Sequence, residues 1–252
     1  MPLRILSTCL FLLGCQAPPA PADDAPLRVL FIGNSFTYAN DLPAAFEAVA
    51  LQAGLPRPTT AMVAFPNAAL QDHLVEGTAL ATLARERWDF VVLQQGPSTL
   101  PESRDSLVAW TTQFGPPIRA AGAEPVLYMV WPGVDQPGPL AACRASYAAA
   151  AAGVNGHFAP VGEAWQLALA ERQTLSVAAG DGFHPSPAGT YLAAVVLLGT
   201  VAGVDPLTLP QSIPGMANIP ELTIRRLQEA ARTRLVGAGW RAGGARHQPR
   251  GP

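Results

Sequence analysis

Short apolar runs rich in β-branched residues alternate with longer helical patterns along most of this chain. Runs of this kind, bounded by turn residues, are typical of strands that are buried on both faces of a sheet. The strand candidates are RVLFIG (28–33), WDFVVLQQ (88–95) and EPVLYMVW (124–131), with TTAMVAF (59–65) and GHFAPV (156–161) as weaker ones. Helical patterns occupy residues 42–54, 70–87, 103–123, 140–153, 187–203 and 220–239. A strand and a helix repeated about five times predict a parallel sheet with helices on both faces, which is an α/β fold.

The composition fits one globular domain and excludes several classes of function. The chain has 252 residues, of which 49% are hydrophobic and 13% charged, so it is long enough to bury a large single core. Its formal net charge of −2 and its scattered arginines provide no basic surface for nucleic acid. Because the sequence contains no lysine, Schiff-base chemistry, pyridoxal phosphate attachment and a P-loop are excluded. No GxGxxG motif follows a predicted strand, so a dinucleotide site has no support.

Residues 1–15 are typical of an export signal. A positive charge at Arg4 precedes a short apolar run, and Cys15 follows a small residue in LLGCQ. The run is too short to cross a bilayer, whereas Leu-Leu-Gly-Cys resembles a bacterial lipobox, in which the cysteine becomes a lipidated N-terminus. We therefore expect lipidation at Cys15 and an exported protein anchored to a bacterial membrane, either periplasmic or at the cell surface. The alternative is a plain signal peptide that is cut near Ala20, which would release a secreted protein.

Three segments follow this signal. Residues 16–26 are rich in proline and alanine and are expected to form an extended tether. Residues 27–236 carry the repeating pattern and form the domain, whereas residues 237–252 are rich in glycine and arginine and are expected to be disordered. Because the signal contains the other two cysteines, Cys143 is the only thiol of the mature domain, and no intramolecular disulfide is possible. It lies in an alanine-rich helical pattern, which favours a packing role.

Ser35 stands just past the first predicted strand, in the turn of LRVLFIGNSFTYANDLP. In open parallel sheets, ligands bind beyond the carboxyl ends of the strands, which is where this serine falls. It either caps the following helix or acts as a nucleophile. A nucleophilic serine needs a base, and the base needs a carboxylate that fixes its tautomer. Among the four histidines only His184 has a suitable neighbourhood, because Asp181 lies three residues before it in a Gly- and Pro-rich loop.

The stretches FIGNSFT and DGFHPSPAGTYLAA resemble the first and last motif blocks of the SGNH or GDSL hydrolase family. The resemblance covers about residues 28–203, with Asn34 where the commoner form of the motif has aspartate. It implies a flavodoxin-like, three-layer α/β/α sandwich with a parallel sheet of about five strands, and no metal or cofactor. It also implies hydrolysis of esters or thioesters through an acyl-enzyme, with Ser35 as nucleophile, His184 as base and then acid, and Asp181 as the orienting carboxylate.

The middle blocks of the family, which help to build its oxyanion hole, match less well. The second block usually has a glycine, and here FPNAALQDHL offers Asn67 instead, through its backbone or its side chain. The third block usually supplies an asparagine amide, and here VVLQQGPSTLPESR offers Gln94, Gln95 and Ser98. We predict that Ser35, Asn67 and at least one of the two glutamines form the oxyanion hole. The alternative for the glutamines is that they only close a buried strand.

Three other residues can be interpreted as having either a structural or a functional role. His73 falls in a helical pattern and is interpreted as a helix-face histidine rather than a site residue. Trp131 and Pro132 follow the fourth predicted strand. They either line the pocket for the acyl group or sugar, or form the edge of the core.

Together these features predict a serine esterase that hydrolyses O-acyl esters, with small acyl groups on carbohydrate as the first substrate class to test; this last step rests on family analogy. The expected partner is a small-molecule or carbohydrate ester, with no nucleic acid, and with a membrane only through the lipid anchor. One alternative is an acyltransferase that uses the same three residues. Another is a non-catalytic carbohydrate-binding lipoprotein, against which the intact Ser35, Asp181 and His184 argue.

Overall fold

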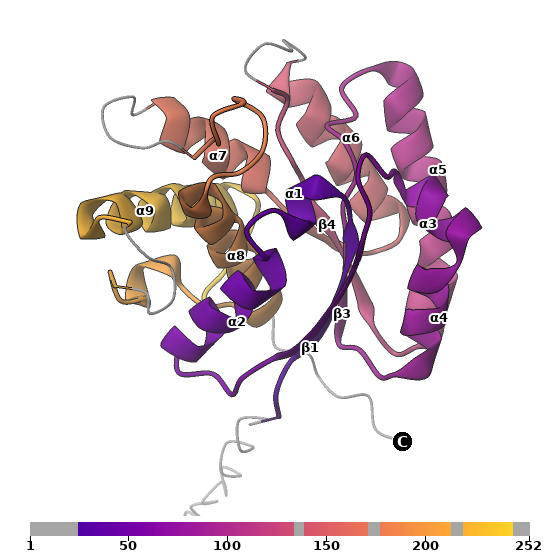
Figure 1. Ribbon diagram of the computed structural model, residues 1–252, viewed down its shortest axis with the longest axis horizontal. Helices are drawn as coiled ribbons and strands as arrows, with labels where there is room; N and C mark the ends of the chain where they lie inside the picture. Colours follow the sequence, from indigo (N-terminus) through magenta and orange to yellow (C-terminus); the bar gives the residue numbers. More distant parts are fainter. Residues whose placement is uncertain (1–24, 134–138, 171–176, 213–218, 244–252) are drawn as a thin grey trace, which may run out of the picture.

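The computed structural model describes residues 25–133, 139–170, 177–212 and 219–243. Within these ranges five strands form one sheet in the order β2-β1-β3-β4-β5, and every neighbouring pair is parallel. The strands are β1 (Arg28–Gly33), β2 (Thr59–Ala64), β3 (Phe90–Leu93), β4 (Glu124–Tyr128) and β5 (His157–Ala159). Helices cover both faces of this sheet (Figure 1). The predicted three-layer α/β/α sandwich is therefore confirmed.

Each face of the sheet has its own set of helices. One layer contains α2 (Leu42–Gln52), α7 (Val161–Ala170), α8 (Pro187–Ala202) and α9 (Glu221–Gly237). The other contains α3 (Leu70–Glu76), α4 (Thr78–Arg85), α5 (Pro101–Ala120) and α6 (Leu140–Gly153). The short α1 (Ser35–Tyr38) follows β1 directly, and a 3-10 turn η1 (Pro206–Thr208) follows α8. Because the strands are parallel, the loops after them meet at one edge of the sheet, and α1 lies on that edge.

The helix α8 is buried on all sides and fixes one wall of that edge. All of its residues from Gly189 to Val201 are buried, since it packs against α2, α7 and α9 and also contacts β5. A helix without a polar face is stable in water only when it is enclosed in this way. Its first residue, Pro187, lies three positions after His184, so the loop that carries the histidine is attached directly to the core.

The elements differ from the sequence pattern where local backbone geometry intervenes. The helix predicted at 70–87 is divided into α3 and α4 by Gly77, which adopts a left-handed φ of 87° that favours glycine. The strand predicted at 156–161 ends at Ala159, and the sequence analysis missed α7, which begins at Val161. A side chain at Gly162 in the first turn of α7 would overlap the Val130 carbonyl, so this close approach of the helix to the segment after β4 requires glycine.

The prediction of a disordered segment at 237–252 is wrong for its first part. Gly237 ends α9, and the residues up to Gly243 are held against the C-terminal part of α8. The indole N–H of Trp240 donates to the Gly199 carbonyl at 2.8 Å, and the Gly243 N–H donates to the Gly203 carbonyl at 3.0 Å. A single tryptophan anchors a glycine-rich stretch here, which composition alone does not reveal. Residues 244–252 lie outside the described part.

Cys143 lies in the core, as its helical pattern predicted. The side chain is fully buried on α6, and its Sγ donates to the Val130 carbonyl at 3.2 Å. Burial raises the pKa of this thiol to about 12, so it stays protonated and unreactive at neutral pH. Cys15, the predicted signal and most of the predicted tether lie outside the described residues. Within the described part, none of the helices has both the length and the hydropathy needed to span a membrane.

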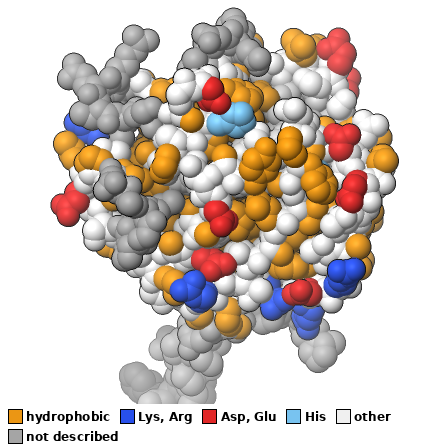
Figure 2. Space-filling view, in the orientation of Figure 1, with side chains coloured by type: hydrophobic (Ala, Val, Ile, Leu, Met, Phe, Trp, Pro, Cys, Tyr) orange, Lys and Arg blue, Asp and Glu red, His pale blue; other side chains and the backbone are white. Residues whose placement is uncertain are grey.

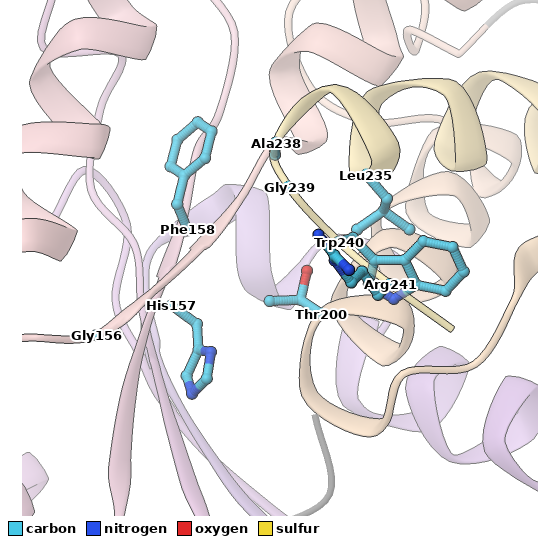
Figure 3. A pocket seen from close by; sticks show the side chains of 9 residues that line it. All are labelled: Gly156, His157, Phe158, Thr200, Leu235, Ala238, Gly239, Trp240 and Arg241. Atoms are coloured by element: carbon cyan, nitrogen blue, oxygen red, sulfur yellow. The ribbon is translucent and has the colours of Figure 1, made fainter. Parts of the chain in front are cut away.

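A cavity of about 510 Å³ lies between the edge strand β5 and the C-terminal segment (Figure 3). The residues that line it are Gly156, His157, Phe158, Thr200, Leu235, Ala238, Gly239, Trp240 and Arg241. None of them is a predicted site residue, so this cavity is separate from the edge that carries Ser35.

Charged side chains are unevenly distributed on the face shown in Figure 2. The basic side chains visible there gather mainly at the lower end, whereas acidic and hydrophobic side chains are also seen toward the upper end. In the same orientation the strands run upward to α1 (Figure 1). Among the described residues, the carboxyl edge of the sheet therefore presents little positive charge on this face.

Candidate active site

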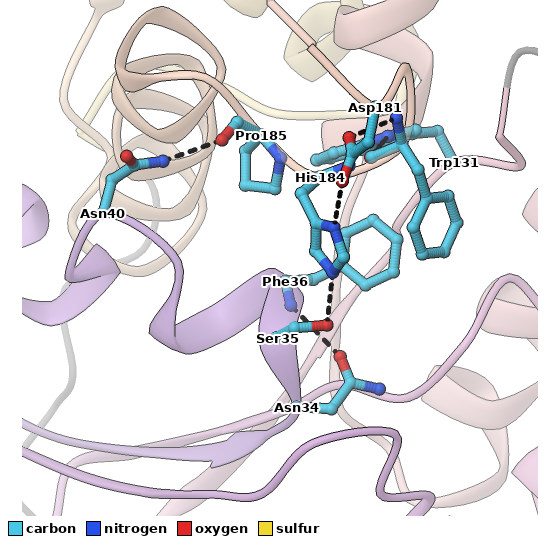
Figure 4. Close-up of polar contacts among 9 residues, drawn as sticks. Asn34, Ser35, Phe36, Asn40, Trp131, Asp181, His184 and Pro185 are labelled. Carbon is cyan, nitrogen blue, oxygen red and sulfur yellow. Dashed lines mark hydrogen bonds and ion pairs between the residues drawn. The ribbon is translucent and has the colours of Figure 1, made fainter. Parts of the chain in front are cut away.

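The turn that carries Ser35 is capped by its neighbour. Asn34 is the N-cap of α1, and its Oδ1 accepts a hydrogen bond from the Phe36 N–H at 3.2 Å. Ser35 is the first residue of the helix, and its hydroxyl makes no capping bond. Instead, Ser35 Oγ lies 2.8 Å from Nε2 of His184 (Figure 4). The interpretation of Ser35 as a helix cap is thus wrong, because Asn34 fills that role.

Gln94 holds this turn through reciprocal hydrogen bonds. Its Oε1 accepts from the Asn34 N–H at 2.9 Å and from the Thr37 hydroxyl at 2.8 Å. Its Nε2 donates to Asn34 Oδ1 at 2.9 Å and to the Gln95 carbonyl at 2.8 Å. A side chain at Gly33 would overlap both Gln94 Oε1 and Thr37 Oγ1, which explains the glycine there. Because both amide protons of Gln94 are engaged inside the protein, its predicted role as an oxyanion donor is wrong.

His184 lies in a loop whose conformation is set by Asp181. The Asp181 Oδ1 accepts from the N–H groups of Phe183 and His184, each at 3.0 Å. The other oxygen, Oδ2, lies 2.6 Å from Nδ1 of His184 (Figure 4). The loop is closed by a bridge between Ala178 and Pro185. The structure thus brings the three residues predicted to be catalytic into one chain of contacts, Asp181 to His184 to Ser35.

The charge of Asp181 determines the tautomer of His184. The hydrogen bond from His184, followed by the backbone N–H groups of Phe183 and His184, lowers the pKa of Asp181 to about 2. The carboxylate is therefore ionised at neutral pH, and it can only accept a hydrogen bond from the Nδ1–H group of His184. A neutral imidazole then has its lone pair on Nε2, directed at the Ser35 hydroxyl. This is the arrangement that a general base needs to activate a serine.

Two backbone N–H groups in the segments around this chain of contacts are candidates for binding an oxyanion. Neither the Ser35 nor the Asn67 N–H has an acceptor among the described residues. Asn67 lies in the loop between β2 and α3 with a left-handed φ of 57°, a conformation in which asparagine is the usual substitute for glycine. This geometry accounts for an asparagine where the family's second block has glycine. A contribution of Asn67 to the oxyanion hole through its backbone N–H stays a prediction.

Gln95 stabilises the loop between β2 and α3, which contains Asn67. Its Oε1 accepts from the Leu70 N–H at the start of α3 at 3.2 Å, and its Nε2 donates to Ser98 Oγ at 3.1 Å. Both Gln95 and Ser98 are buried. The alternative stated for the glutamines, that they close a buried strand, therefore describes Gln94 and Gln95 better than a donor role does.

Aromatic side chains fill the space behind His184. Phe36 contacts Phe183 edge-on, with ring centroids 4.7 Å apart, and it also contacts Trp131 at 5.1 Å. Trp131 is only 2% exposed and stacks on Trp165 at 3.5 Å. Its indole N–H donates to the Phe183 carbonyl at 3.0 Å. Of the two readings of Trp131, the core edge is therefore correct, whereas the neighbouring Pro132 is partly exposed.

His73 is more than a histidine on a helix face. It is fully buried, and its Nε2 lies 2.8 Å from the Gly33 carbonyl, the last residue of β1 before the Asn34 turn. Its ring stacks on Phe65 with centroids 5.1 Å apart. His73 therefore ties α3 to the strand end that carries the nucleophile, and its neutral Nε2–H tautomer is the one that can donate to a carbonyl.

The described residues contain no group of three or more histidine, cysteine, aspartate or glutamate side chains that could hold a metal ion. The candidate site thus consists of Ser35, His184 and Asp181, with the backbone N–H groups of Ser35 and Asn67.

Comparison with solved structures identifies the family. A protein from Slackia heliotrinireducens that is assigned to the SGNH hydrolases matches with a TM-score of 0.59 and 30% sequence identity. The match covers 70% of this chain and 99% of that chain. This chain belongs to the SGNH hydrolase family. The resemblance seen in the sequence is confirmed, and the chain is accordingly a serine hydrolase that acts on ester bonds.

Two further structures share the fold of this SGNH hydrolase. A DUF4886 family protein from Bacteroides uniformis matches with a TM-score of 0.64 at 18% identity, covering 89% of this chain and all (100%) of that chain. An acetylxylan esterase from Geobacillus stearothermophilus matches with a TM-score of 0.51 at 17% identity, covering 68% of this chain and 92% of that chain. Neither a family model nor a curated protein matches the chain significantly.

His73 should make the free energy of unfolding of this SGNH hydrolase depend on pH. Burial is the main cause that lowers the pKa of His73 below its ordinary value of 6.5, while the hydrogen bond to the Gly33 carbonyl, and then the charges of Asp72 and Glu76, oppose it. The unfolded chain therefore binds a proton near pH 6.5 before the folded one does, so stability is complete above this pH and is lost as the pH falls. Thermal melts at pH 8 and pH 5, taken here as working values on either side of about 6.5, should show a loss for the wild type and a smaller loss for His73→Gln. Glutamine can still donate to Gly33. Equal losses would contradict this prediction.

Proposed function

We propose that this SGNH hydrolase removes small O-acyl groups from neutral carbohydrate esters, with Ser35 as nucleophile, His184 as general base and acid, and Asp181 as the carboxylate that orients it. The observation that carries the proposal is the unbroken chain of contacts from Asp181 through His184 to Ser35, beside two free backbone N–H groups. A purely structural role for Ser35 would not explain why Nε2 of His184 lies 2.8 Å from its Oγ.

Acylation begins when Ser35 Oγ attacks the carbonyl carbon of the ester and its proton passes to His184 Nε2. The carbonyl oxygen becomes negative, and the N–H groups of Ser35 and Asn67 stabilise it. One such donor typically contributes about 3 kcal/mol to a transition state. His184 then returns the proton to the leaving alcohol oxygen as the C–O bond breaks. The acyl group remains on Ser35, and Asp181 keeps the imidazolium oriented throughout.

Deacylation repeats these steps with water in place of serine. His184 takes a proton from the water, whose oxygen attacks the acyl carbon, and the same two N–H groups stabilise the second tetrahedral intermediate. The proton then passes from His184 to Ser35 Oγ as the acyl bond breaks, which releases the carboxylic acid. If a sugar hydroxyl enters instead of water, the same residues carry out acyl transfer, so analysis of the products in the presence of a sugar acceptor distinguishes the two.

Two observations favour a small neutral substrate. The acetylxylan esterase that shares this fold acts on an acetylated sugar polymer, which is an analogy of fold and not of site. On the face in Figure 2, the basic side chains of the described residues gather mainly at the lower end, so no arginine cluster among these residues is seen at the carboxyl edge of the sheet to pair with a charged substrate. A neutral ester with a short acyl chain fits both observations.

We also propose that the enzyme is exported and anchored through lipid at Cys15. The support is the Leu-Leu-Gly-Cys sequence after a short apolar run, followed by the Pro- and Ala-rich residues 16–26. A tether of this composition would hold the domain away from the membrane surface. Such a location suits an enzyme that acts on carbohydrate outside the cytoplasm.

Replacement of Ser35 or His184 by alanine should abolish turnover. Because the two act as a unit, each single variant should lose on the order of a thousandfold or more in kcat, and the double variant should be hardly worse. Asp181→Ala should cost less, since the base remains present but loses its orientation. Turnover of p-nitrophenyl acetate should be measured together with thermal melts. Ser106→Ala, at an exposed serine of α5, is the matched control. A folded Ser35→Ala variant that keeps its activity would refute the proposed chemistry.

The acyl pocket should discriminate by length. If the natural group is acetyl-sized, kcat/KM should fall steadily from p-nitrophenyl acetate to butyrate and octanoate, because a longer chain clashes or stays exposed to water. The Ser35→Ala variant supplies the background rate for each ester. Activity that is equal or higher on octanoate would instead point to a lipase or lysophospholipase.

The anchor is tested on the full-length chain produced in a bacterial host. We expect lipid at Cys15 by mass spectrometry and recovery of the protein in the membrane fraction, and loss of both in Cys15→Ser. Cys9→Ser, which changes the other cysteine of the same segment, should behave like the wild type. An unmodified mature N-terminus near residue 20 would remove the anchor from the proposal and leave the chemistry untouched.

A further inference from the structure

Three consecutive carbonyl groups of the histidine loop each accept a hydrogen bond, one from within the loop and two from other parts of the molecule. The Phe183 carbonyl accepts from the Trp131 indole at 3.0 Å, and the His184 carbonyl accepts from the Ala179 N–H at 2.8 Å. The Pro185 carbonyl accepts from Nδ2 of Asn40 at 2.7 Å (Figure 4). The backbone on both sides of His184 is thereby fixed. Of these three donors, Asn40 is the one that comes from the segment carrying the nucleophile.

Asn40 occupies a position suited to linking the two catalytic segments. It lies five residues after Ser35, in the turn between α1 and α2, with a left-handed φ of 53°. Its Nδ2 donates to Pro185 and also contacts the Thr190 hydroxyl at 3.1 Å, in the first turn of α8. One amide group thus joins the nucleophile segment to both the histidine loop and the helix that follows it. These contacts span about 145 to 150 positions of sequence.

The link matters because proton transfer depends steeply on distance. Ser35 and His184 come from opposite ends of the domain, and the contact between them is 2.8 Å long. Their side chains can shift relative to each other unless the two backbones are held together. A misplacement of about 1 Å at a reacting pair can lower a rate roughly a hundredfold.

We propose that Asn40 is a positioning residue of this enzyme: its amide locks the loop of His184 to the turn of Ser35 and keeps Nε2 within reach of the serine hydroxyl. The proposal rests on the proposed function, since it assigns Asn40 to the same reaction. Asn40 touches no reacting atom and acts through Pro185, next to the base. Trp131 fixes the same loop from the segment after β4, but it is buried in the core, so Asn40 offers the cleaner test.

Two variants separate the contribution of the Asn40 amide group from that of the backbone conformation at this position. Asn40→Asp keeps the size and the tolerance for positive φ but replaces the donor by an acceptor that faces the Pro185 carbonyl. Asn40→Gly removes the side chain without straining the backbone. Asn155 is a matched control, because it is also exposed and has a positive φ of 49°, and its side chain bonds to no described residue. Asn155→Asp and Asn155→Gly are therefore made in parallel.

The expected result is a fall in kcat of roughly tenfold to a hundredfold in both Asn40 variants, with KM little changed. The rate at which a neutral fluorophosphonate modifies Ser35 should fall in parallel, since it also depends on the base. Rates are normalised to the number of active sites titrated at completion, so a partly unfolded sample does not imitate the effect. Both Asn155 variants should keep the wild-type kcat.

Asn40 variants with the same normalised kcat and modification rate as the Asn155 variants would overturn the proposal, even if their melting temperatures fall. A loss confined to KM would overturn it as well, because it would assign Asn40 to substrate binding. Ser35→Ala is included in the same assay. If it retains activity, the proposed function itself fails, whereas an inactive Ser35→Ala beside fully active Asn40 variants rejects the role of Asn40 alone.

Discussion

The reciprocal hydrogen bonding between Asn34 and Gln94 is the interaction on which the rest of the site depends. It joins the carboxyl ends of β1 and β3, and both amides are buried. Removal of either side chain would leave one buried hydrogen-bonding group of the other without this partner, at a cost of about 1–3 kcal/mol. Gly33 leaves the space that Gln94 fills, and His73 holds the Gly33 carbonyl. The turn that presents Ser35 is therefore a fixed extension of the sheet.

The other half of the site, formed by Asp181 and His184, is stabilised in a different way. The side chains of Asp181 and His184 are 50% and 35% exposed, so the charged carboxylate keeps part of its hydration. Its pKa is low because His184 and two backbone N–H groups bond to it, and not because a buried cation stands nearby. Buried neutral amides thus position the nucleophile, whereas the ionised group stays near solvent. This division avoids the large cost of burying an isolated charge.

The sequence allowed prediction of those features that depend on local pattern. The parallel sheet, α8 and the pairing of Asp181 with His184 follow from apolar periodicity or from residues three positions apart. The role of Gln94 depends on Asn34, and that of Trp131 depends on Phe183. Because these partners lie far away in the sequence, no local pattern predicts the contacts. The same holds for α7, which needs the close approach at Gly162, and for Trp240, whose partner lies on α8. The sequence correctly indicated that Gln94, at the end of β3, belongs to the site region. It could not indicate which way the amide side chain points.

The asparagine at position 34 and the absence of glycine in the loop after β2 belong together. Asn34 Oδ1 caps α1, and its Nδ2 donates to the Ala68 carbonyl at 2.9 Å, directly beside Asn67. An aspartate would cap the helix equally well, but it would present a second acceptor to that carbonyl and push the loop away. With an amide at position 34, the loop is held by a side chain, and Asn67 adopts the left-handed conformation that elsewhere needs glycine. The hydroxyl of Ser35 is left without a structural task, which keeps it available to His184.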